Sequence, residues 1–320
     1  MSWQDYFAYN SCEESYTYRD NNVISLPANL PMPPFADFSC LFSNCEQLQD
    51  ISALANWDTS KVTKMWYMFS DCRQLQDLTA LANWDVSNVK NMGWMFSNCK
   101  RLKDISPLSS WNTDKVTVMS LMFAGCTSLQ NITALSNWDV SNVTDMDELF
   151  NGCEQLQDIT ALSKWIVSNV TVMDEMFSHC YQLQDITALS NWDVSNVEDM
   201  SCMFHGCELL KDITPLAIWI VSNVKDMSYM FCDCYQLQDI PALSNWDTTN
   251  VKDMTCMFAH CDKLNFLTDI FLMKYYLIER IRYIPQTINE LKANIQRQQQ
   301  MIDRMQEEIN DITESLQRNP

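Results

Sequence analysis

A fixed 27-residue interval between like side chains is the feature that most restricts how this chain can fold. Tryptophan, cysteine, phenylalanine and leucine each recur at this interval, with no insertion from Phe42 to Leu264. The tryptophans stand at positions 57, 84, 111, 138, 165, 192, 219 and 246. One 27-residue unit is too small to bury its own apolar side chains, whereas stacked units bury each column against its copies above and below. The period therefore predicts a solenoid.

Each unit is expected to hold a short parallel strand, a polar turn of the Ser87-Asn88-Val89 type that leads into a second short extended piece, and a compact return. The segment from Leu48 to Asn56 matches the leucine-rich-repeat pattern, which predicts the strand there. The segment from Met68 to Cys72 suits a short helical or 3₁₀ return. The third core-facing residue of the leucine-rich-repeat pattern, after Leu48 and Ile51, is either Ala53 or Leu54. We favour Leu54, because a file of exposed leucines would make an apolar stripe on the surface.

The predicted fold class is α/β: a leucine-rich-repeat solenoid of eight 27-residue units with capping segments, followed by a long coiled-coil helix. Residues 1–44 are expected to form an N-terminal cap with a degenerate first coil, and residues 45–264 the solenoid. Residues 265–284 read as a C-terminal capping helix and 285–320 as a coiled-coil tail. When the 27-residue pattern is continued backward into the cap, six residues fall on its core columns: Ile24, Leu30, Phe35, Phe38, Leu41 and Phe42. The aromatic residues before position 20 are expected to fold over that end.

The tail repeats apolar residues at alternating spacings of three and four. This heptad pattern predicts self-association as a dimer or a trimer, and the alternative is an amphipathic helix folded back along the solenoid. The inward positions are Ile288, Leu291, Ile295, Gln298, Ile302, Met305, Ile309, Ile312 and Leu316.

The repeat resembles the BspA-type leucine-rich repeats of surface proteins, which occur in bacteria, protists and large DNA viruses. The residues that carry the resemblance run from Asn137-Trp138-Asp139 to Met146, followed by Leu149-Phe150 and Cys153. Similar strings cover residues 42–264. The chain has one residue more than the family pattern between the Ile51 column and the Asn-Trp pair. The resemblance implies surface adhesion or interaction with a host.

Composition and motifs argue against catalysis and against nucleic acid. The net charge of −20, from 41 acidic and 21 basic residues, repels phosphate backbones. The chain has three histidines, which we interpret as chance surface residues, and neither a phosphate-binding loop nor a nucleophile motif. The cysteine column is interpreted as buried and reduced, and no zinc-type pattern of cysteine pairs occurs. We therefore predict a protein that is not an enzyme and has no cofactor or metal.

Three groups of residues are candidates for contact with a protein partner. Asp158, Asp185 and Asp212 belong to an aspartate column that either accepts backbone hydrogen bonds or forms an electrostatic surface. Ile166 and Ile220 replace an aspartate of the other coils, and either pack on each other or mark a contact patch. The third group is a set of exposed aromatic candidates beside the Met-Phe turn: Trp66, Tyr67 and Trp94.

The function expected from the sequence is non-enzymatic recognition of proteins or surface display, multimerised through the tail. The alternative is a structural or scaffold component of a large DNA virus particle or of an intracellular assembly. No secretory signal and no membrane-spanning stretch is visible, so we expect a cytoplasmic or virion-associated protein. Exposure on a cell surface would then require a non-classical route.

Overall fold

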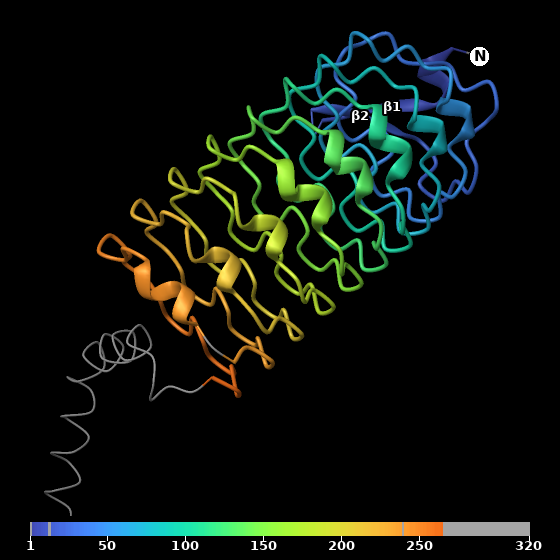
Figure 1. The fold of residues 1–320 in the computed structure, drawn as a ribbon. Helices are drawn as coiled ribbons and strands as arrows, with labels where there is room; N and C mark the ends of the chain where they lie inside the picture. The colour runs from blue at the N-terminus through green and yellow to red at the C-terminus, as the bar shows by residue number, and fades with distance from the viewer. Residues whose placement is uncertain (1, 12–13, 239, 265–320) are drawn as a thin grey trace, which may run out of the picture. The chain divides into compact units, whose positions relative to one another are not determined.

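The described part of the chain is a stack of coils with a 27-residue repeat (Figure 1). The computed structural model describes residues 2–11, 14–238 and 240–264. Isolated parallel bridges join each coil to the next, from Asp37 to Lys64 and onward through Asn91 to Asp253. This arrangement is the repeat solenoid that the period predicts. The predicted capping helix (265–284) and the tail residues from Ile288 to Leu316 lie outside the described residues.

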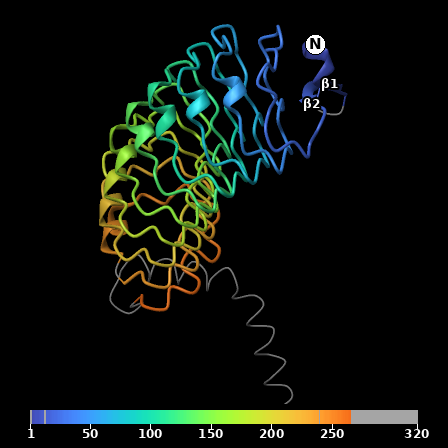
Figure 2. The same ribbon diagram turned by 90° about the vertical axis from the view of Figure 1, so that its right-hand side faces the viewer.

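One short 3₁₀ helix per coil lies along the same edge of the stack (Figures 1 and 2). These helices are η2 (Ser52–Leu54), η3 (Thr79–Leu81), η4 (Ser106–Ser110), η5 (Thr133–Asn137), η6 (Thr160–Lys164), η7 (Thr187–Leu189), η8 (Thr214–Leu216) and η9 (Pro241–Asn245). Within the described residues no α-helix occurs, so the α/β class is corrected to a coil of 3₁₀ helices and single bridges. The same residues contain no helix with the length and apolar character needed to cross a bilayer.

The segment that begins at Leu48 holds η2, and in place of a continuous strand this column has isolated parallel bridges, Ser25 to Asp50 and Asp104 to Asn131. The continuous ladder of bridges runs through Lys64 and its copies, in the second extended piece expected after the polar turn. Leu54 is fully buried on η2 while Ala53 is half-buried, so the favoured inward residue is confirmed.

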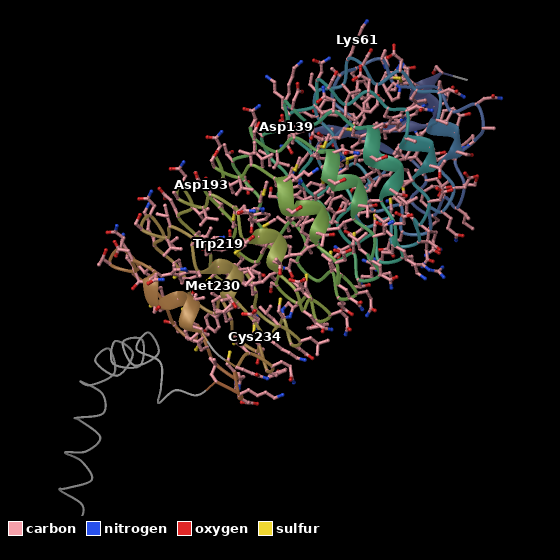
Figure 3. The ribbon with its side chains drawn as sticks, viewed as in Figure 1. Lys61, Asp139, Asp193, Trp219, Met230 and Cys234 are labelled. Atoms are coloured by element: carbon pink, nitrogen blue, oxygen red, sulfur yellow. The ribbon has the colours of Figure 1, made fainter. Side chains whose placement is uncertain are left out.

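The interior consists of files of identical side chains. The phenylalanine rings stack from Phe42 to Phe258 with centroid separations of 5.4–5.9 Å. The tryptophan rings stack in pairs of adjacent coils, with centroid separations of 6.0–6.4 Å: Trp57–Trp84, Trp111–Trp138, Trp165–Trp192 and Trp219–Trp246. Figure 3 labels the buried Trp219 and Met230 in one coil, and the exposed Asp193 at the edge. These files are the continuous apolar core that no single coil could form.

The cysteine column is buried, and the described cysteines are free thiols. From Cys72 to Cys261, each thiol of the column donates to a phenylalanine carbonyl of the preceding coil, as Cys126 does to Phe96 at 3.1 Å. Burial raises the pKa of Cys126 to about 12. The interpretation of this column as small, reduced core residues is confirmed.

Two positions in every coil have a left-handed backbone, and both follow the ladder residue. One column includes Tyr67 and Trp94, and the other, four residues later, includes Asp71 and Asn98. Backbone N–H groups at both columns donate to the next coil, for example Tyr67 to Gly93 at 3.0 Å. Most residues reach this conformation at a cost of about 1–2 kcal/mol. The bonds between coils offset that cost.

A β-hairpin covers the first coil. After η1 (Trp3–Asp5), β1 (Phe7–Asn10) pairs antiparallel with β2 (Ser15–Tyr18), with Phe7 opposite Tyr18. Phe7 is buried and contacts Phe42 at a centroid distance of 5.9 Å. The expected covering of this end by aromatic residues is thus observed.

One predicted core position in the cap is wrong. Ile24 is 59% exposed, and Leu26 is buried instead. The reason is that the Ile24 carbonyl accepts hydrogen bonds from Gln49 and Asp50, which turns its side chain outward.

Candidate functional site

The aspartate column lies at the start of the 3₁₀ helices and closes turns. Each carboxylate accepts a hydrogen bond of 2.8 Å from the backbone N–H two residues later: Asp158 from Thr160, Asp185 from Thr187, and Asp212 from Thr214. The threonine hydroxyls of the last two pairs also donate to the same oxygens. Asn131 stands in this column and accepts the equivalent bond from Thr133 at 3.0 Å. The column therefore has a structural task that does not require a charge.

Ile166 and Ile220 are both exposed. Their exposed fractions are 61% and 60%, so neither side chain buries the other across the intervening coil. That coil carries Asp193 at the equivalent position, where it accepts a hydrogen bond from Ser195. Such exposure is compatible with a contact patch.

The predicted aromatic candidates do come together. Trp66 contacts Tyr67 edge-on at a centroid distance of 4.3 Å, and Tyr67 stacks on Trp94 of the next coil at 4.7 Å. Trp66 is 37% exposed, and the other two are half-buried. Gly93 makes room for this cluster, since a Cβ there would lie 3.3 Å from the Trp66 ring.

These aromatics begin a longer surface, which we name the ladder face. It consists of the two residues that stand two and three positions after each ladder residue. Along the stack these pairs are Trp66–Tyr67, Gly93–Trp94, Ser120–Leu121, Asp147–Glu148, Asp174–Glu175, Ser201–Cys202, Ser228–Tyr229 and Thr255–Cys256. Backbone hydrogen bonds of 2.7–3.0 Å from the second residue of the first seven pairs, Tyr67 to Tyr229, hold neighbouring coils together.

Four carboxyl groups meet in the middle of the ladder face: Asp147, Glu148, Asp174 and Glu175. All four are half-buried. The amide of Asn151 donates to Glu148 at 2.8 Å and to Glu175 at 2.9 Å, which ties the two glutamates together. One buried oxygen of Asp147, Oδ1, has no hydrogen-bond partner.

The crowding of these carboxyls changes their ionisation. Burial, followed by the charge of Asp174 and a hydrogen bond with it, raises the pKa of Asp147 to about 8. Burial and the charge of Asp199 raise the pKa of Asp174. Burial also raises the pKa of Glu148, and Glu175 adds to this. A cation placed beside these carboxyls would stabilise their charged forms, which burial disfavours at Asp147, Glu148 and Asp174.

A hollow of ≈ 290 Å³ connects the aromatic and the acidic parts of the ladder face. Its lining includes Trp94, Leu121, Glu148 and Asn151. A larger hollow of ≈ 630 Å³ lies beside η2 and η3, with Asp50 in its wall. There the carboxylate of Asp50 is already engaged by Ser25 and by the backbone of Ser52.

Sequence reasoning identified the aromatic end of this surface but not its acidic centre. The signal was present, because the columns of Trp66 and Tyr67, followed through the repeats, become acidic only at Asp147–Glu148 and Asp174–Glu175. The large number of other aspartates concealed it.

A family model described as "Mycoplasma protein of unknown function, DUF285" matches residues 36–135, 130–214 and 186–295. Among solved structures, a leucine-rich repeat protein from Bacteroides ovatus is similar, with 18% identity, a TM-score of 0.38 and coverage of 75% of this chain. This chain spans 64% of that protein's length. A leucine-rich cell surface protein from Faecalibacterium prausnitzii is also similar, with 17% identity, a TM-score of 0.30, and coverage of 81% of this chain and 91% of its own. No curated protein matches.

Proposed function

Since the chain belongs to the family described as Mycoplasma protein of unknown function, DUF285, and has BspA-like leucine-rich repeats, we propose that it recognises or displays proteins without catalysis. The ladder face is the proposed binding surface. The proposed partner is a polypeptide segment that presents an apolar or aromatic side chain next to lysine or arginine.

The observation that carries this proposal is the adjacency of aromatic and acidic groups on one surface. Tryptophan and tyrosine supply large contact areas with little entropy to lose, and they are enriched among the residues that dominate binding energies. Trp66, Tyr67 and Trp94 offer such an anchor. A few coils away, Glu148 and Glu175 offer charges for a basic residue of the same segment.

The acidic group differs from the other aspartates of the chain. Aspartates such as Asp158 and Asp139 accept backbone hydrogen bonds that close turns. In contrast, burial raises the pKa of both Asp147 and Asp174, the charge of Asp174 raises the pKa of Asp147 further, and Asp147 keeps an oxygen without a partner. Groups that destabilise one another in the free protein are those that a basic partner would relieve.

A displayed library of random 12-residue peptides, selected on the purified protein, tests the proposal. The expected result is enrichment of peptides that combine lysine or arginine with an aromatic or aliphatic residue. A ladder-face variant with Trp66→Ser, Trp94→Ser, Glu148→Gln and Glu175→Gln should lose at least tenfold in affinity for them. The glutamines retain an oxygen that can accept from Asn151.

The matched control removes the same type of charge from the other edge, through Asp158→Asn, Asp185→Asn and Asp212→Asn. Asn131 already accepts the turn bond in this column, so these changes preserve the fold. Binding should be unchanged in this control. The opposite result would contradict the proposal: if the peptides bound the ladder-face variant with the affinity of the parent protein but bound the control variant weakly, the binding surface would be the edge formed by the 3₁₀ helices.

Multimerisation through the heptad residues Ile288 to Leu316 is a further part of the proposal. It rests on the sequence pattern. Copies held together in this way would bind a multivalent partner more tightly than one copy does.

A further inference from the structure

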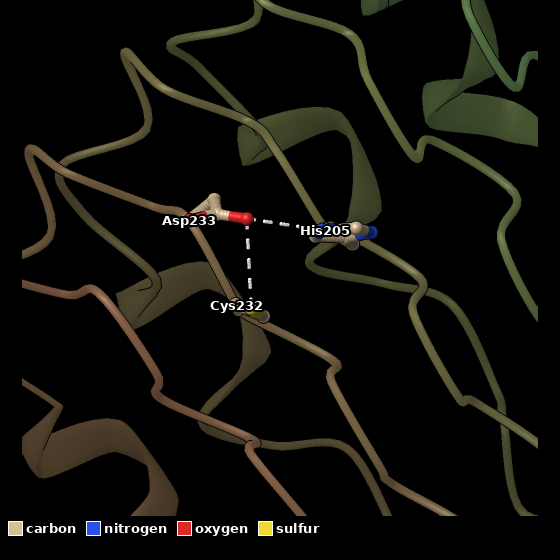
Figure 4. Close-up of side chains that lie close together, drawn as sticks. All are labelled: His205, Cys232 and Asp233. Atoms are coloured by element: carbon tan, nitrogen blue, oxygen red, sulfur yellow. Dashed lines mark hydrogen bonds and ion pairs between the residues drawn. The ribbon is translucent and has the colours of Figure 1, made fainter.

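Three different metal-ligating side chains meet in two adjacent coils, directly after the ladder-face residues Cys202 and Tyr229 (Figure 4). The ring nitrogen Nε2 of His205 lies 3.2 Å from Oδ2 of Asp233. The thiol Sγ of Cys232 lies 3.6 Å from the same oxygen. The three donor atoms are all within 4.8 Å of one another.

The repeat explains how residues so distant in sequence come together. His205 and Cys232 are separated by one full repeat, so they occupy the same column in neighbouring coils. The backbone N–H of Gly206 donates to the Cys232 carbonyl at 2.8 Å, which fixes the two coils in register. Asp233 follows Cys232 with a left-handed backbone, φ 59°, and its carboxylate turns back toward His205.

The two separations that involve Oδ2 of Asp233, 3.2 Å to Nε2 and 3.6 Å to Sγ, match edges of a tetrahedron around zinc. Bonds of about 2.0–2.1 Å to nitrogen, about 2.0 Å to oxygen and about 2.3 Å to sulfur place tetrahedral N and O ligands about 3.3 Å apart, and S and O ligands about 3.5 Å apart. Calcium and magnesium select sets of oxygen ligands, whereas a set with imidazole and thiolate selects zinc and related transition metals.

We propose that His205, Cys232 and Asp233 bind one divalent transition-metal ion of the zinc class, through Nε2, Sγ and Oδ2. Cys232 is buried, and the other two side chains are about one-quarter exposed, so an ion can enter from solvent. Three protein ligands leave a fourth position open to water. The ring of His179 lies beside the site, 4.7 Å from that of His205.

Gly206 keeps this place open. A Cβ on Gly206 would lie 2.8 Å from Nδ1 of His179, and the residue has φ +71°. A side chain at this position would therefore displace the histidine ring. The proposed ion would join two coils across their interface, in addition to the backbone bonds.

Titration with Co²⁺ of the reduced full chain, first stripped of metal with a chelator, tests the site. Cobalt bound to a thiolate gives a charge-transfer band in the near ultraviolet. The expected result is a band that saturates at one Co²⁺ per chain and disappears when Zn²⁺ is added. Cys232→Ser should abolish the band, and His205→Ala should weaken binding by more than the roughly tenfold loss that follows removal of an outer partner.

Two further variants separate ligand loss from misfolding. Asp233→Asn keeps a residue type that the same left-handed column accepts at Asn98, so it should fold normally and bind more weakly. Cys202→Ser removes a half-exposed thiol outside the cluster and should leave the band unchanged. Absence of the band from the parent protein, or its survival in Cys232→Ser, would overturn the proposal.

Discussion

The indole Nε1 of Trp138 donates a hydrogen bond to the carbonyl of Leu108, 3.1 Å away in the preceding coil. The same carbonyl accepts the backbone N–H of Trp111, also at 3.1 Å. One oxygen thus connects the tryptophans of two coils. The equivalent bond recurs from Trp84 to Trp246.

Trp138→Phe should lower the free energy of unfolding by about 1–3 kcal/mol, because it removes a buried hydrogen bond worth about 1 kcal/mol and part of the packed ring. Urea denaturation followed by circular dichroism measures the change. The control is Trp66→Phe on the ladder face, for which the expected change is within about 0.5 kcal/mol. If both variants lost the same free energy of unfolding, the buried tryptophan column would have no special role in stability.

The Asp147 carboxyl should make the protein less stable as the pH rises. In the folded chain its pKa is about 8, whereas an unfolded aspartate titrates near pH 3.9. Between these values the folded state binds more protons, so this contribution to stability is complete below about pH 4 and is lost as the pH rises through about 8. Asp147→Asn should flatten the fall in melting temperature between pH 5 and 9.

Asp139→Asn is the control for that experiment. The side chain and the backbone N–H of Ser141 lower the pKa of Asp139, so its contribution is present at neutral pH and is lost only as the pH falls toward the folded pKa. Its variant should keep the parent's slope between pH 5 and 9. If Asp147→Asn also kept that slope, the raised pKa of Asp147 would be refuted.

Two glycines of the same left-handed column should respond differently to alanine. A Cβ on Gly152 would have its nearest neighbour at 3.6 Å, whereas one on Gly125 would collide with Oδ1 of Asn98. Gly152→Ala should therefore cost about 1–2 kcal/mol, the price of the backbone conformation alone. Gly125→Ala should cost more, as measured by urea denaturation, and a smaller loss for Gly125→Ala would contradict the described packing.

The tail prediction can be tested in the full chain. Ile295→Asp with Ile302→Asp places charges at inward heptad positions and should reduce the mass measured by light scattering to that of one chain. Ala293→Asp with Gln300→Asp, on the opposite side of the predicted helix, should leave the mass unchanged. A parent protein that is already monomeric would refute self-association.

The apolar core was predictable from spacing alone, because side chains at equal intervals on a regular coil must lie above one another. Which of the two expected extended pieces forms the continuous ladder was not. The pattern around Leu48 is compatible with either a strand or a 3₁₀ turn, and the choice depends on which backbone groups face the next coil. For the same reason the outward turn of Ile24 was missed.

Of the two left-handed columns, one could be predicted from its residue types and the other could not. The column of Asp71 and Asn98 contains residue types that tolerate a positive φ, so its sequence carried a signal. The column of Tyr67 and Leu121 carries none, because bonds between coils impose the conformation whatever the side chain. The cluster of His205, Cys232 and Asp233 was overlooked in a similar way. His205 and Cys232 lie one repeat apart in the sequence. Their proximity is therefore seen only when the same column is followed from one repeat to the next.

The uniform bonding between coils has a consequence for how such a chain can change over time. Every joint in the stack offers the same donors and acceptors, so the duplication or deletion of one whole repeat would leave the remaining coils able to rejoin in register. The length of the stack can thus vary by whole turns while the interior remains continuous. Each added turn would bring a new pair of outward residues, and these are free to diversify because the scaffold beneath them does not depend on their identity.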